Sequence, residues 1–104
     1  MNQIIEVHVT FPDVESAHAT GRTLVEEKWV ACVNVFHIQS LYLWHNKLIQ
    51  EPEYSVLLKT IASRIDGLLH KINSLHPYDI PAITWHPIET TPEYRDWILE
   101  TLSQ

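Results

Sequence analysis

The sequence predicts an α+β fold whose elements run in the order βαββαβ, followed by a helix at the C-terminal end. Four segments alternate apolar and polar residues with the period of a strand, and three carry apolar residues at helical spacing. With 104 residues, 45% of them hydrophobic and 19% charged, the composition is that of one globular domain spanning residues 1–104. Turn signals separate the segments, so each element can be assigned in order.

The first predicted strand is Gln3–Phe11, because apolar side chains on one face alternate with mostly polar side chains on the other. Pro12 and Asp13 interrupt this pattern, and Asp13 is placed to cap a helix. Apolar residues then recur at helical spacing over residues 14–28, with the acidic residues largely on the outer side. A strand followed by an amphipathic helix is therefore expected in the first quarter of the chain.

Two strand-like segments, Val30–Trp44 and Glu53–Thr60, flank a short polar stretch and predict a hairpin. The first segment would reach roughly 50 Å if straight. A compact domain of this length is only about 34 Å across. The hairpin therefore has to bend sharply or lie on another subunit.

The second half of the chain predicts a helix, a strand and a last helix. Apolar residues follow a helical rhythm over Ile61–Leu75, and the segment that starts at His76-Pro77 ends that helix because proline disfavours its continuation. Ile80–Ile88 is the fourth strand, with Trp85 on its core-facing side. Thr91 as cap and Pro92 at the first helical position begin the terminal helix.

This order predicts a ferredoxin-like sandwich, in which two split βαβ units give a four-stranded antiparallel sheet with both helices on one face. The other face stays open, and its large apolar members indicate that another subunit covers it. The side chains that alternation assigns to this open face are Glu6, His8, Cys32, Asn34, Phe36, Leu57, Lys59 and His86.

Several short motifs resemble the signature segments of one known family, and they extend over essentially the whole chain. They are Ala31-Cys32-Val33-Asn34, Leu41-Tyr42-Leu43-Trp44, Glu53-Tyr54, Leu58-Lys59-Thr60 and His76-Pro77-Tyr78-Asp79-Ile80-Pro81. The chain is identified as a member of the CutA divalent-cation tolerance family. The resemblance implies a tight homotrimer with long hairpins that reach across neighbours, a role in metal tolerance, above all to copper, and a trimer similar to that of PII signalling proteins.

Composition excludes several classes of partner. A net charge of −6 and a pI near 5.5 give no basic surface for nucleic acid, and no polybasic stretch could hold an anionic membrane. Cys32, the only cysteine, cannot form an intramolecular disulfide, and its place in a strand favours a packed residue over a reactive thiol. Without a signal-peptide pattern or an apolar run of about 20 residues, a cytoplasmic location is expected.

Seven scattered histidines invite a metal-binding hypothesis, and His76 is the first candidate ligand. The resemblance implies it, because the histidine directly before Pro-Tyr is a copper ligand in some family members. The other two ligand positions of that family site carry Val9 and Leu75 here, which weakens or removes a Cu(II) site. The alternative is that His76 caps the preceding helix or bonds a local backbone group.

A second possible metal site follows from strand alternation. Glu6, His8 and His86 fall on the open face of two antiparallel neighbouring strands, and a carboxylate with two imidazoles could coordinate a transition metal. The alternative is a polar network buried at the centre of the trimer.

A third expectation is an inter-subunit cleft. Lys59 would bind an anion there, and the other residues assigned to it are Glu53, Tyr42, Trp44 and Tyr78. The alternative is that Lys59 forms an ion pair that fixes the trimer, since an unpaired buried ammonium is costly. Trp44, near the hairpin tip, is expected to anchor the interface.

These observations together predict a homotrimeric divalent-cation tolerance protein that binds Cu(II) weakly or indirectly. The competing hypothesis is a PII-like signalling or scaffold trimer that binds a small molecule or a protein in its inter-subunit clefts. No catalytic constellation can be identified, and two glycines cannot build a phosphate-binding loop, so an enzyme is not expected.

Overall fold

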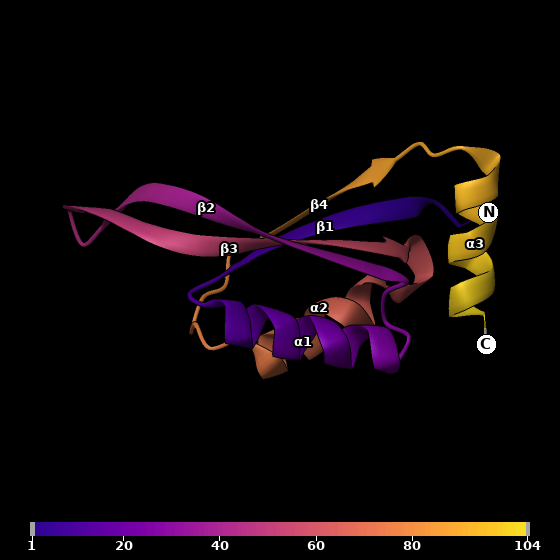
Figure 1. Ribbon diagram of the computed structural model, residues 1–104, viewed down its shortest axis with the longest axis horizontal. Coiled ribbons are helices and arrows are strands. Elements are labelled where there is room, and N and C mark those ends of the chain that lie inside the picture. The colour runs from indigo at the N-terminus through magenta and orange to yellow at the C-terminus, as the bar shows by residue number, and fades with distance from the viewer. Residues whose placement is uncertain (1, 104) are drawn as a thin grey trace.

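A computed structural model describes residues 2–103 and confirms the α+β fold. The elements are β1 Ile4–Phe11, α1 Val14–Glu26, β2 Cys32–Trp44, β3 Lys47–Ile61, a 3₁₀ turn Ala62–Arg64, α2 Ile65–Leu75, β4 Ile83–Ile88 and α3 Pro92–Leu102. The four strands form one antiparallel sheet in the order β2-β3-β1-β4, which is the ferredoxin-like arrangement. Helices α1 and α2 lie side by side on one face of this sheet, whereas α3 packs at one end (Figure 1).

The main hydrophobic core lies between the sheet and helices α1 and α2. Strand β1 occupies the centre of the sheet, and its inward side chains, Val7 and Phe11 among them, are almost completely buried. Leu24 of α1 and Leu68 of α2 close the core from the helical side. A smaller cluster around Ile98 joins α3 to the end of the sheet.

The predicted helix caps are present. The Asp13 side chain accepts a hydrogen bond from the Ser16 N–H at 2.7 Å, which satisfies one of the unpaired donors of the first turn of α1. At α3, the Thr91 hydroxyl accepts the Tyr94 N–H at 3.4 Å, with Pro92 beginning the helix. Both helix starts could therefore be predicted from the sequence.

The β2–β3 hairpin projects well beyond the helices (Figure 1), and the molecule measures 45 × 24 × 22 Å. The predicted start of the third strand at Glu53 was wrong, because β3 begins at Lys47 and the two strands are joined by a tight turn at His45 and Asn46. Both turn residues have positive φ, 50° and 63°, as a two-residue hairpin turn of matching twist requires. Pro52 is tolerated within β3 because pairing with β1 stops at Tyr54, leaving one flank of the strand without a neighbour in the chain.

Three further expectations need correction. Ile61 ends β3 opposite Ile4 and does not begin the second helix. The fourth strand starts at Ile83, not at Ile80. Trp85 was expected in the core, but it is 49% exposed: it shares the helix-facing side with Val7, yet it lies on the edge strand, where the helices do not cover it.

Candidate functional site

His76 lies at the C-terminal end of α2, where it joins three parts of the chain. Its Nδ1 accepts a hydrogen bond from the Tyr78 N–H at 3.0 Å, and its Nε2 donates one to the Thr10 carbonyl at 2.7 Å. The ring stacks on Phe11 with the centroids 4.3 Å apart. Since a backbone N–H can only donate and a carbonyl can only accept, these contacts fix the neutral tautomer with the proton on Nε2.

This geometry leaves no free nitrogen lone pair on His76 for a metal ion. Burial lowers the pKa of the imidazole, which also favours the neutral ring. Val9, at one of the two other positions implied by the family resemblance, is a buried core residue. These contacts match the alternative considered from the sequence, in which His76 bonds local backbone groups. Metal binding at His76 would first have to break its hydrogen bond to the Tyr78 N–H.

Glu6 holds together a polar cluster on the open face. The register pairs it with Lys59 on one side and His86 on the other. Its carboxylate lies 3.4 Å from Lys59 Nζ and 3.6 Å from His86 Nε2. The third expected member, His8, instead makes a 2.8 Å hydrogen bond between its Nε2 and the Ser55 hydroxyl.

Within residues 2–103 of one chain, no three histidine, cysteine, aspartate or glutamate side chains are grouped so that they could hold a metal ion. Glu6 and His86 together offer two ligands, and His8 is directed elsewhere. The open face can therefore contribute to a metal site, but it does not complete one within a single chain.

The Lys59 neighbourhood has three further members, of which alternation had assigned Asn34 and Cys32 to the open face beside Lys59, whereas Tyr94 was not predicted. The Asn34 carbonyl oxygen accepts hydrogen bonds from Lys59 Nζ at 3.4 Å and from Cys32 Sγ at 3.7 Å. Burial, and next to it the Cys32 thiol, raise the pKa of Tyr94. The pairing of Cys32 with Lys59 in the strand register was the available signal for this group, whereas the approach of Tyr94 from α3 had none.

The residues expected to line a cleft are divided among separate places on one chain. Tyr78 donates a 2.8 Å hydrogen bond to the carboxylate of Glu53, a residue that is only 6% exposed. Further along the hairpin, Tyr42 donates to Glu51. Each bond to a carboxylate raises the pKa of its phenol: that of Tyr42 rises to about 12, and that of Tyr78, which burial raises first, also rises strongly.

Lys59 and Trp44 do not join these tyrosines within one chain. Lys59 is six residues from Glu53 along β3, which corresponds to roughly 20 Å. Trp44 lies at the hairpin tip, 55% exposed, with its ring edge-on to that of His45. A cleft that contains all five expected residues would therefore need a second copy of the chain.

The projecting part of the hairpin carries an apolar surface that the chain itself does not cover. We call residues 38–53 the distal hairpin, since they lie beyond the last residues that pair with β1. Its exposed large apolar side chains are Leu41, Tyr42, Leu43, Trp44 and Leu48, with exposed fractions from 38% to 71%. So many large apolar groups on one projection are typical of a protein interface.

A ferredoxin-like sheet with an over-long, exposed apolar hairpin and a polar open face defines the structural class of this protein. Comparison with known proteins gives the family. The family model described as "CutA1 divalent ion tolerance protein" matches residues 5–101, and the chain belongs to this family. The divalent-cation tolerance protein CutA of Thermotoga maritima is 36% identical over 95% of this chain and 99% of its own length. The protein of that name from Pyrococcus horikoshii is 37% identical over 93% and 96%.

Solved structures agree with this assignment. The CutA1 structure from Ehrlichia chaffeensis superposes with a TM-score of 0.94 at 29% identity, covering 100% of this chain and 99% of that one. The CutA structure from Archaeoglobus fulgidus, described as periplasmic, gives a TM-score of 0.92 at 31% identity over 95% and 98%. In the part of this chain that the structure describes, no helix is long and apolar enough to cross a membrane.

Proposed function

We propose that this protein serves divalent-cation tolerance as a homotrimer whose distal hairpins lie on neighbouring subunits, and that it binds Cu(II) weakly at the seams between chains. Family membership supports the link to divalent cations. The observation that carries the proposal is the exposed apolar distal hairpin, which one chain cannot bury.

The hairpin supports a trimer through its two apolar faces. Side chains alternate along β2 and β3, so that Tyr42 and Trp44 lie on the open-face side and Leu41 and Leu43 on the opposite side. A two-stranded hairpin is marginally stable in water without further packing. Contact with a neighbouring subunit covers these side chains and supplies the missing packing.

In the proposed metal site, Glu6 and His86 provide two ligands for Cu(II). His86 is well exposed, with 63% of its side chain accessible, and the chain's net charge of −6 attracts cations. Carboxylate and imidazole are suitable Cu(II) ligands. Because two protein ligands leave the remaining positions to water or to another subunit, binding is expected to be weak.

We further propose that the protein acts in the cytoplasm and by binding, not by catalysis. The Glu6–Lys59–His86 cluster resembles an ion-pair network on a sheet face more than a catalytic arrangement, since its charges neutralise one another. Cell fractionation with an antibody tests the location; recovery of the protein in the periplasmic or secreted fraction would contradict it.

Two measurements test the main proposal. Light scattering of the wild-type protein is expected to give three times the 12.1 kDa chain mass. Calorimetric titration with Cu(II) is expected to show weak binding that His86→Ala removes and His70→Ala, an exposed histidine on α2, leaves unchanged. No heat above buffer at micromolar copper would refute direct metal binding, whereas equal binding by both variants would refute the Glu6–His86 site.

A further inference from the structure

Lys59 is the least exposed of the three residues in the Glu6–Lys59–His86 cluster. Its side chain is 13% exposed, compared with 22% for Glu6 and 63% for His86. Its ammonium lies 3.4 Å from Glu6 Oε2 and 3.4 Å from the side-chain oxygen of Asn34. An ammonium so far removed from water needs such acceptors, because an unpaired buried charge is costly. Lys59 is therefore held between one charged acceptor and one neutral acceptor.

The two carboxylate oxygens of Glu6 face different partners. Oε1 lies 3.6 Å from His86 Nε2, whereas Oε2 faces Lys59. The strand register explains this division, since Glu6 of β1 lies opposite Lys59 of β3 on one side and His86 of β4 on the other. One metal ion with two bonds of about 2.0–2.2 Å can bridge ligand atoms at such a separation. Glu6 and His86 thus fit one ion, but the carboxylate that they would use already neutralises Lys59.

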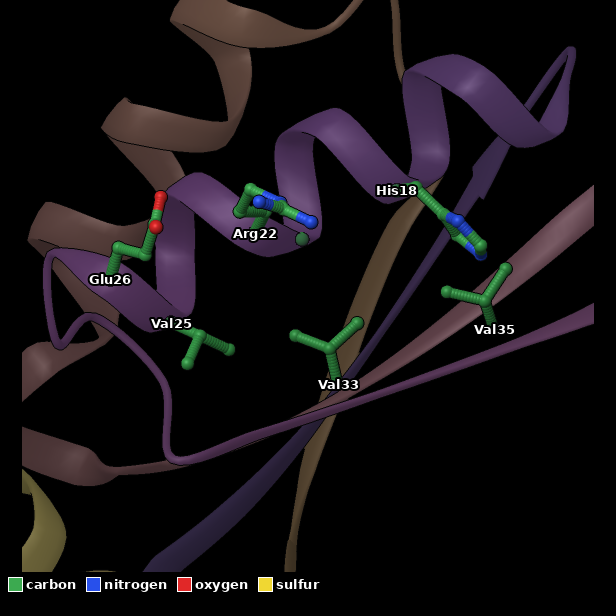
Figure 2. A pocket seen from close by; sticks show the side chains of 7 residues that line it. His18, Arg22, Val25, Glu26, Val33 and Val35 are labelled. Atoms are coloured by element: carbon green, nitrogen blue, oxygen red, sulfur yellow. The ribbon is translucent and has the colours of Figure 1, made fainter.

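A groove between α1 and β2 also contains a histidine and a carboxylate, but it does not bring them together (Figure 2). Its volume is about 320 Å³, and Figure 2 shows Arg22 of α1 between His18 and Glu26. The last two residues are eight positions apart on one helix, which corresponds to roughly 12 Å along its axis. No single ion bridges that distance. The suitability of the Glu6–His86 pair therefore comes from the strand register and not from the presence of the two side-chain types alone.

We propose that Lys59 is the resident counter-ion of the metal site: its ammonium competes with Cu(II) for the Glu6 carboxylate, and it turns to Asn34 when the ion binds. This inference rests on the proposed Glu6–His86 site and adds the residue that regulates its affinity. Coulomb energy scales with the product of the charges, so Lys59 repels a divalent ion twice as strongly as a monovalent ion at the same place. Little water screens this repulsion, because the Lys59 side chain is mostly buried.

Asn34 gives the displaced ammonium a second acceptor. Its side-chain oxygen is as far from Lys59 Nζ as Glu6 Oε2 is. A carboxylate binds an ammonium more strongly than a neutral amide oxygen does, so Lys59 prefers Glu6 in the metal-free protein. When the metal ion draws on the charge of Glu6, the bond to Asn34 keeps the ammonium from being left without an acceptor. Lys59 thus weakens metal binding, whereas Asn34 lowers the cost of releasing Glu6.

Removal of the ammonium tests the competition. Lys59→Met keeps an unbranched side chain but loses the charge. Lys71→Met is the matched control, because it removes the same charge from an ion pair with Glu27, 3.2 Å long, on the helical side of the sheet. Calorimetric titration with Cu(II) is expected to show Lys59→Met binding roughly tenfold or more tighter than the wild type, and Lys71→Met binding within about twofold of it.

A second variant is expected to change the affinity in the opposite direction. Asn34→Ala removes the neutral acceptor and leaves Lys59 with Glu6 alone, so Cu(II) should bind roughly threefold or more weakly than to the wild type. Asn34 is exposed, so this variant tests the proposal even if Lys59→Met does not fold. A general loss of structure cannot produce tighter binding in one variant and weaker binding in the other.

The outcomes separate the counter-ion from the metal site itself. Wild-type affinity in Lys59→Met, or an equal gain in Lys71→Met, would overturn the role of Lys59. The metal site would still stand in that case if His86→Ala removed binding. An absence of binding in the wild type and in Lys59→Met alike would refute the Glu6–His86 site, and the counter-ion with it.

Discussion

The body of the molecule and its distal hairpin belong to one sheet but are stabilised in opposite ways. In the body, β1 has strands on both sides and helices on one face, so Val7 and Phe11 are almost completely buried. In the distal hairpin, the same alternation of side chains leaves Leu43 at 71% exposure and Leu48 at 67%. The difference shows that the chain buries the apolar side chains of its body by its own contacts, whereas those of the distal hairpin stay exposed, and we propose that another copy covers them.

The largest expected effect comes from opening the body core. Phe11→Ala removes a buried ring that also stacks on His76, and it should lower the free energy of unfolding by about 3–5 kcal/mol. Leu43→Ala is the matched change in the distal hairpin and should alter the stability of the isolated chain by less than about 0.5 kcal/mol. Chemical denaturation measures both; equal losses in dilute, dissociated protein would remove the distinction between the two regions.

A smaller loss in the free energy of unfolding is expected from a substitution in α2, at the point where this helix passes close to a tryptophan. A Cβ on Gly67 would lie 2.5 Å from Trp29 Cζ3, so Gly67→Ala must displace the indole and should cost about 1–3 kcal/mol. The control is Asn73→Ala, a substitution at an exposed residue of the same helix. Thermal unfolding followed by circular dichroism compares them, and a Gly67→Ala protein as stable as the wild type would show that the body is packed less tightly than described.

Substitution of two tyrosines allows the stability contributed at the base of the hairpin to be compared with that contributed at its middle. Tyr78→Phe leaves the buried Glu53 carboxylate without its hydroxyl donor and should cost about 1–3 kcal/mol. Tyr42→Phe removes the analogous bond to Glu51 in a more exposed setting, so its cost should be below about 0.5 kcal/mol. Urea denaturation of the two variants measures the difference, and the reverse order would contradict the burial of Glu53 as the cause.

The smallest effect is a dependence of body stability on pH. Burial holds the pKa of His76 below its ordinary value of 6.5, so the unfolded chain binds this proton more readily than the folded one. The stability that the neutral ring provides is therefore complete above pH 6.5 and is lost as the pH falls through the lowered pKa. His76→Gln should flatten this loss between pH 7 and 5, whereas His70→Gln should not; unfolding midpoints at several pH values decide between them.

Sequence patterns predicted the body well because its elements are decided locally. The Asp13 and Thr91 caps and the alternation of β1 each follow from near neighbours along the chain. Trp85 shows the limit: its side of the sheet was predicted correctly, but its exposure depends on β4 being an edge strand beyond the helices. The Tyr94–Cys32 contact likewise depends on how α3 packs against the sheet, which periodicity does not determine.

The candidate site was predicted in part for the same reason. Alternation brought Glu6 and His86 to one face, and the register confirmed that they are neighbours. It could not show that His8 turns to Ser55, or that His76 uses both ring nitrogens for backbone groups. These outcomes depend on side-chain directions, which follow from tertiary packing.

Hydrogen exchange of the distal hairpin at micromolar protein concentration tests most directly whether another copy completes it. An isolated two-stranded ribbon exchanges its amides with little protection. We predict instead that amides of residues 38–53 are protected to nearly the same degree as those of β1, and that this protection falls on dilution. Rapid, concentration-independent exchange in residues 38–53 beside a protected β1 would contradict the account.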